Sequence, residues 1–206
     1  MTDLAAAPRI DGRTARATRT RTAIVDAHLA LISEGDLKPT GERIAERAGV
    51  SLRALWANFK DMEALFAASG ERVFARQAAE HQTISPDLPL ARRVEEFCRQ
   101  RVGMLEIIAP IARAAALKEP FSVALRRNRA RLIGAVREEL ETLFAAELGP
   151  PGAGRDQIVY GMTAASTWSA WSMLRDELEL TVDEGYNVMV RTLTALLMAA
   201  IAAGVR

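Results

Sequence analysis

The stretch Ile44-Ala-Glu-Arg-Ala-Gly-Val-Ser51 constrains the fold more tightly than any other part of this sequence. Thr40 can cap a short helix that runs into this stretch with its apolar residues on one side. Gly49 then stands where a helix commonly ends in a left-handed residue, a conformation that glycine adopts without a steric penalty. Ser51 can cap a second short helix, with Leu55 pointing inward. Two short helices joined by so tight a turn predict a helix-turn-helix motif, although an ordinary helical hairpin has the same local pattern.

The remaining sequence also has the spacing of helices. Apolar residues recur three and four apart from Arg19 onward, aromatic residues make up only 5 %, and no strand pattern, repeat or glycine-rich phosphate loop stands out. Pro110 is expected to kink or break a long helix, and Thr181 with Glu184 forms a capping box. We therefore expect an all-α fold of about nine helices. The longer expected helices cover residues 19–34, 61–80, 88–117, 120–148, 155–177 and 181–203.

Positive charge collects at the amino end of a chain whose net charge is only +1. Residues 1–60 hold ten Lys and Arg against seven Asp and Glu, whereas the rest hold seventeen against nineteen. The first part of this segment is rich in arginine among small polar residues, a composition that cannot bury a core. We expect a flexible basic arm over 1–18, a helix-turn-helix domain over 19–65 and a helical body over 66–206.

The region from Arg19 to Phe66 resembles the DNA-binding domain of the TetR family of transcriptional regulators. The resemblance rests on residues that occur in the family's order: Ile24, Ala27, Gly35, Thr40, Ile44, Ala45, Ala48, Gly49, Val50, Ser51, Leu55, Trp56, Phe59 and Leu65. It implies a homodimer that binds a pseudo-palindromic DNA operator, most often as a repressor released by a small molecule. The residues after 66 match the family only in being helical.

The short helix that follows Ser51 is the expected reading helix. Arg53 is its one long cation, so we expect it to contact a base, most favourably guanine through two hydrogen bonds. Ser51 stands at a helix N-terminus, where free amides suit a phosphate, and the arm could enter the minor groove. The candidate DNA-binding residues are Thr40, Arg43, Ser51, Leu52, Arg53, Trp56, Asn58 and Lys60.

Three residues depart from the family's usual pattern. Trp56 stands where the family usually has tyrosine, Asn58 where it often has histidine, and Met62 where it usually has lysine. Indole and amide groups can still donate hydrogen bonds. Lys60 is the candidate source of the missing positive charge.

The helical body is expected to hold two further sites, both implied by the resemblance. Helices between about residues 85 and 175 would enclose a pocket for a largely apolar effector, and the last two helices would pair with those of a second copy. Apolar residues at helical spacing are equally typical of plain core. The candidate pocket residues are Phe97, Arg101, Met104, Ile108, Phe121 and Trp168. The candidate dimer residues are Trp171, Leu174, Met189, Leu193, Leu196, Leu197 and Ala200.

Other classes of function find little support in the sequence. The two histidines, His28 and His81, and the single cysteine, Cys98, stand in no acid–base or metal-ligand motif, so we expect no enzyme, metal or cofactor. The longest apolar run, 195–205, is too short to cross a bilayer, so we expect a soluble cytoplasmic protein. The alternative left open is a helical protein-interaction module that has kept the fold and lost operator binding.

Overall fold

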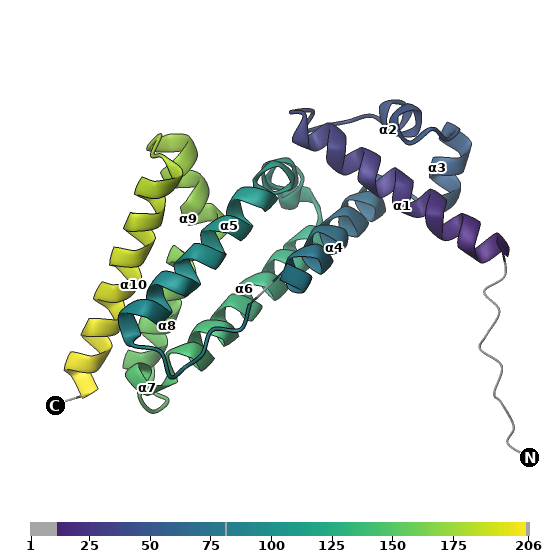
Figure 1. Cartoon of the computed structure of the whole chain (residues 1–206). Helices are drawn as coiled ribbons and strands as arrows, with labels where there is room; N and C mark the ends of the chain where they lie inside the picture. Colours follow the sequence, from purple (N-terminus) through teal and green to yellow (C-terminus); the bar gives the residue numbers. More distant parts are fainter. Residues whose placement is uncertain (1–11, 81, 205–206) are drawn as a thin grey trace, which may run out of the picture. The chain divides into compact units, whose positions relative to one another are not determined.

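The computed structural model describes residues 12–80 and 82–204, and these residues form helices and turns without a strand. This confirms the all-α expectation, with ten α-helices in the described ranges where about nine were predicted. The helices are α1 (Gly12–Ser33), α2 (Gly41–Ala48), α3 (Leu52–Asn58), α4 (Met62–Glu80), α5 (Leu90–Ala116), α6 (Val123–Leu143), α7 (Ala145–Leu148), α8 (Ala153–Ala165), α9 (Trp168–Ser172) and α10 (Val182–Gly204), with a 3-10 turn η1 (Glu119–Phe121) and a π-helical turn η2 (Met173–Glu177) (Figure 1).

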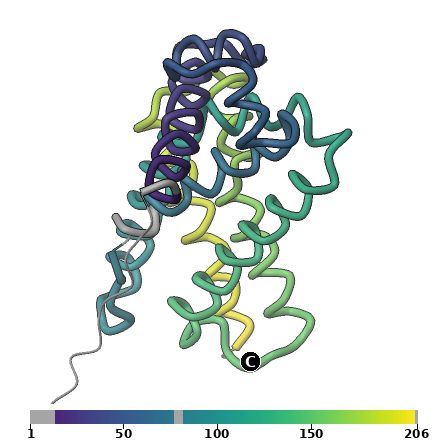
Figure 2. Tube along the Cα trace, turned by 90° about the vertical axis from the view of Figure 1, so that its right-hand side faces the viewer, coloured from purple at the N-terminus to yellow at the C-terminus, as the bar shows by residue number. Residues whose placement is uncertain are grey.

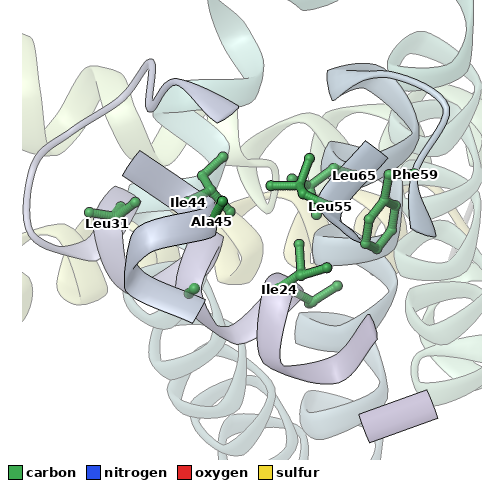
Figure 3. Packing of buried hydrophobic residues seen from close by; sticks show 9 residues of the cluster. Ile24, Leu31, Ile44, Ala45, Leu55, Phe59 and Leu65 are labelled. Atoms are coloured by element: carbon green, nitrogen blue, oxygen red, sulfur yellow. The ribbon is translucent and has the colours of Figure 1, made fainter. Parts of the chain in front are cut away.

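The chain divides into two compact units, Met1–Phe74 and Ala75–Arg206. The division falls inside α4, later than the boundary predicted after residue 65. In the first unit, α1, α2, α3 and the start of α4 surround one apolar core (Figure 3). Its centre is formed by side chains that are fully or almost fully buried: Ile24, Leu31, Ile44, Ala45, Leu55, Phe59 and Leu65.

Helix α1 begins at Gly12, so residues 12–18 are helical and do not belong to a flexible arm as predicted. Alanine, arginine and threonine alternate there without a helix breaker, and the Thr18 hydroxyl donates to the Thr14 carbonyl at 3.0 Å. Arg21 lies 4.1 Å from the centre of the Phe59 ring and donates to the Asn58 carbonyl at 2.7 Å. It therefore ties α1 to the end of α3. The earlier part of the predicted arm, residues 1–11, lies outside the described residues.

Helix α4 is fixed to α1 by polar contacts as well as by the core. His28, which the sequence left without a role, is buried, with Nδ1 2.8 Å from Ser69 Oγ and its ring edge-on to Phe66. Arg72 donates to both carboxylate oxygens of Asp26, at 2.7 and 3.1 Å. The start of α4 is thus held as firmly as the two short helices before it.

The second unit is a bundle in which α10 packs against α8 and α5, and α6 packs against α8 (Figure 2). Phe97, Leu105, Leu140, Trp171 and Leu193 lie at its centre with almost no exposed surface.

Helix α5 continues through Pro110 to Ala116, so the proline does not end it. The predicted helix 120–148 is wrong at its start, because Pro120 belongs to η1 and Ser122 caps α6 by accepting from the Leu125 amide at 3.1 Å.

The predicted helix 155–177 is three shorter pieces, since the chain breaks after α8 and Thr167 caps α9. The capping box of α10 is confirmed by hydrogen bonds in both directions. The Thr181 amide donates to Glu184 Oε2 at 2.8 Å, and the Glu184 amide donates to Thr181 Oγ1 at 3.2 Å.

Candidate nucleic-acid interface

Helices α2 and α3 form the predicted helix-turn-helix, with each boundary fixed by a local interaction. Thr40 Oγ1 accepts from the Arg43 amide at 3.4 Å, and Ser51 Oγ accepts from the Ala54 amide at 3.1 Å. Gly49 ends α2 with a φ of 66°. The turn therefore needs glycine for its left-handed backbone, as the sequence predicts.

Helix α3 is buried on one side and open on the other. Leu55 has no exposed surface, whereas Leu52 and Trp56 are 37 % and 39 % exposed. Arg53 is also exposed and makes no ion pair within residues 12–80 or 82–204. A long cation that is exposed and unpaired on the open side of this helix is suited to the edge of a base pair.

The other exposed cations of this unit differ in how strongly the protein holds them. Arg43 pairs with Asp36. Arg47 donates to both oxygens of Glu34, at 2.6 and 2.9 Å, and these hydrogen bonds lower the pKa of Glu34. Lys60 is 84 % exposed and lies 3.6 Å from Asp61. Of the candidate DNA-binding residues Arg43 and Lys60, Lys60 is therefore the more available, because Arg43 must first leave Asp36.

Asn58 is turned back onto its own helix. Its Nδ2 donates to the Ala54 carbonyl at 2.8 Å and the residue is half-buried. Of its two amide hydrogens, one is committed within the chain and one stays available to a phosphate.

The predicted pocket residues occupy different environments in the second unit. Phe97 and Ile108 are buried, and Met104 is half-buried. Arg101 donates from Nε to the Ser166 carbonyl at 2.7 Å, and burial lowers its pKa to about 10.

Trp168 is half-buried, with the Arg113 guanidinium 5.4 Å from its ring centre. Phe121 is 91 % exposed in η1, which corrects its expected place on the wall of an enclosed pocket.

Most of the predicted dimer residues lie inside the second unit. Trp171 is fully buried and donates from Nε1 to Glu106 at 2.7 Å. Within the single chain α10 packs against α5 and α8, and the part of these residues in a dimer stays a prediction. The buried residues are Trp171, Leu174, Met189, Leu193 and Leu197, and the half-buried ones are Leu196 and Ala200.

A different set of apolar side chains on α8 and α10 is exposed. Tyr160, Val188 and Met198 are 56 %, 38 % and 54 % exposed, and alternate with the buried set. Only 17 % of the most apolar stretch of α10 is buried, and α10 is the one described helix long and apolar enough to cross a membrane by length and composition alone. The apolar run 195–205 had not indicated this, because it covers less than half of the helix.

Comparison with known proteins supports the fold through structure, not through sequence. No protein-family model matches the chain, and no curated protein matches it. A tetR-family transcriptional regulator from Streptomyces coelicolor matches with a TM-score of 0.68 and 18 % identity, over 90 % of this chain and 83 % of that one. The chain has the fold of the TetR-family transcriptional regulators. The TetR fold extends beyond residue 66, where the sequence alone gave no specific likeness.

Two further structures with this fold carry functional descriptions. The multidrug binding protein EbrR, in complex with imidazole, matches with a TM-score of 0.67 and 20 % identity, over 93 % of this chain and 97 % of that one. MexZ, a key repressor responsible for antibiotic resistance in Pseudomonas aeruginosa, matches with a TM-score of 0.58 and 18 % identity, over 89 % and 95 %.

One residue of the interface escaped sequence reasoning. Gly41, the first residue of α2, is buried against Trp56 and Leu52 of α3. The sequence did hold a signal for this close contact, because glycine stands at the first position of a helix. The backbone there needs no left-handed conformation, so the glycine has another reason.

Proposed function

We propose that this protein is a transcriptional regulator that reads duplex DNA with α3. The observation that carries the proposal is the open side of α3, which holds exposed and unpaired Arg53, in a fold shared with TetR-family transcriptional regulators. Arg53 contacts a base, most favourably guanine through O6 and N7. Thr40 and Ser51 donate their hydroxyl hydrogens to phosphates while their oxygens cap the helices, and Lys60 contacts the backbone.

A homodimer completes the proposal. Only 17 % of the most apolar stretch of α10 is buried, and Val188 and Met198 on that helix are exposed, so this helix offers a face for a second copy. A two-fold contact through this face brings two reading helices to half-sites about 34–36 Å apart, which makes the operator a pseudo-palindrome.

A small, largely apolar molecule is the proposed effector, bound in the second unit along the α5 face that carries Arg101 and Met104. The likeness to EbrR, described as a multidrug binding protein, and to MexZ, described as a repressor, supports an effector and repression. An effector that prefers the DNA-free dimer must lose affinity in the presence of operator by the same factor.

The test is selection from a random-sequence duplex pool at physiological salt, followed by sedimentation of the protein with and without the recovered duplex. The expected result is an enriched inverted repeat bound by two chains. A folded protein that binds no duplex at any salt concentration would instead favour the helical protein-interaction module, because phosphate contacts always produce salt-dependent binding.

A further inference from the structure

The start of α2 and the outer side of α3 approach each other at Gly41. A Cβ atom on Gly41 would lie 2.6 Å from Cζ2 of Trp56 and 3.2 Å from Cδ1 of Leu52. Contacts under 3.0 Å are essentially never seen for a real Cβ. The Gly41 backbone is not left-handed, so the requirement for glycine here is steric.

The two side chains that rest on Gly41 belong to the same helix as the proposed base-reading arginine, Arg53. Leu52 and Trp56 are four residues apart and lie on one side of α3. Both keep more than a third of their surface exposed. The indole thus has one surface seated on the α2 backbone and another facing solvent.

We infer that Gly41 and Trp56 form a positioning pair, in which the bare Cα of Gly41 seats the indole and so sets the surface that α3 presents to DNA. Gly41 acts through Trp56 and touches no base itself. The inference rests on the proposed function for its effect on DNA binding, but the seating of the indole is a property of the free protein.

The pair should affect DNA binding more than stability. An added methyl group at residue 41 can displace the indole outward, because Trp56 is partly exposed. The core of the first unit consists of other side chains, among them the fully buried Ile44 and Leu55. Gly→Ala within a helix is otherwise favourable, which offsets part of the strain.

The test is a double-mutant cycle with G41A, W56F and the double variant, read by binding to the duplex recovered from the random pool. Phenylalanine lacks the outer ring that meets the new methyl group. We expect G41A to weaken binding about tenfold with tryptophan at residue 56 and less than twofold with phenylalanine there. Binding to random-sequence duplex should change less than twofold, because exposed cations such as Lys60 carry it.

A matched control is available in the second unit. Gly103 is exposed within α5, and a Cβ there meets nothing within 4 Å. G103A should leave DNA binding unchanged and the melting temperature equal or higher. If G41A binds the selected duplex as tightly as the unmodified protein, or loses as much in the W56F background, the positioning pair is refuted.

A second measurement separates this inference from the proposed function. The acrylamide quenching of tryptophan fluorescence should rise in G41A and not in G41A/W56F, because the displaced indole of Trp56 becomes more accessible. Absence of DNA binding by the unmodified protein would refute the proposed function, and the quenching result would still decide whether Gly41 seats the indole. Unchanged quenching in G41A refutes the pair.

Discussion

At the scale of single residues, Arg53 and Lys60 are both exposed cations, but their positions suit them to different contacts with DNA. Arg53 lies in the first turn of α3, whereas Lys60 follows the helix. A base contact discriminates between sequences, and a phosphate contact does not.

Arg53→Ala is expected to weaken binding to the selected operator by about 1–3 kcal/mol and to relax selection at one base pair. Lys60→Ala should weaken binding to all duplexes alike and reduce the slope of log K against log salt by roughly 1. Titration of both variants against the operator and a random duplex over a salt series measures these effects. Equal losses on both duplexes for Arg53→Ala would exclude its reading role.

Cys98 gives a residue-scale prediction about the second unit. Its side chain is fully buried, and burial raises the pKa of the thiol to about 12. At pH 8 the reactive thiolate is scarce and shielded, so the folded protein should react with a disulfide reagent at least a hundredfold more slowly than the unfolded chain. Full reaction of the native protein within the time needed for the unfolded chain would show that α5 opens readily at this position.

The role of a residue could be predicted from the sequence where neighbours in the chain determine it. It could not be predicted where the role depends on a partner that is distant in the sequence. Thr40, Gly49 and Ser51 were predictable because capping and left-handed turns depend on neighbours in the chain. The ion pair of Arg43 with Asp36 could not be read from spacing, because it joins a loop to a helix. Phe121 was misplaced because hydrophobicity alone does not say which way a side chain points.

At the scale of elements, helix ends that carry local capping signals were predicted, and helix ends without a clear local signal were not. Helices α2 and α3 match closely because both ends carry capping signals. The break before α9 was missed because Thr167 reads equally well as a cap and as a helical residue. The start of α6 was missed because proline suits the first turn of a 3-10 helix as well as that of an α-helix.

Helices α5 and α7 are joined by an ion pair that predicts a pH effect on stability. Arg93 donates to both oxygens of Glu147, at 2.5 and 3.0 Å, and the two side chains are 8 % and 13 % exposed. The hydrogen bonds from Arg93 lower the pKa of Glu147. A carboxylate with a lowered pKa in the folded state stabilises the fold above its unfolded pKa of about 4.5, and this stabilisation is lost as the pH falls through the folded value.

Glu147→Gln is therefore expected to lower the free energy of unfolding at pH 7 by about 3 kcal/mol, since it leaves Arg93 buried without its counter-charge. The difference from the unmodified protein should shrink below pH 4. Urea unfolding at pH 7, 5 and 3 measures it. Glu138→Gln, on the exposed side of α6, is the control and should change stability by less than about 0.5 kcal/mol. A loss for Glu147→Gln that is the same at every pH would contradict the ionic origin.

At the scale of the whole molecule, α10 carries both buried and exposed apolar side chains, and the proposed dimer depends on the exposed ones. One side of this helix supplies the core of the second unit, whereas Val188 and Met198 on another side remain exposed. A single period of apolar residues does not distinguish the buried side of such a helix from its exposed side. The dimer candidates that the sequence named on α10 include three residues that are buried within the chain, Met189, Leu193 and Leu197.

Met198→Glu tests the outward-facing stripe. Met198 is 54 % exposed, so the substitution should leave the melting temperature within about 2 °C while placing two like charges near the two-fold axis of the dimer. Sedimentation should show the dimer dissociating at a concentration at least tenfold higher than for the unmodified protein. Operator affinity should fall with it, because two unlinked reading helices bind half-sites independently.

Val123→Glu is the matched control, since Val123 is also 54 % exposed but stands at the start of α6. It adds the same charge to the same unit and should leave both the dimer and operator binding unchanged. Equal dissociation of both variants would mean that added negative charge, and not its place on α10, disrupts the assembly. A Met198→Glu protein that remains dimeric would show that the dimer interface does not include this face of α10. The geometric reason for an operator with half-sites one DNA turn apart would then no longer hold.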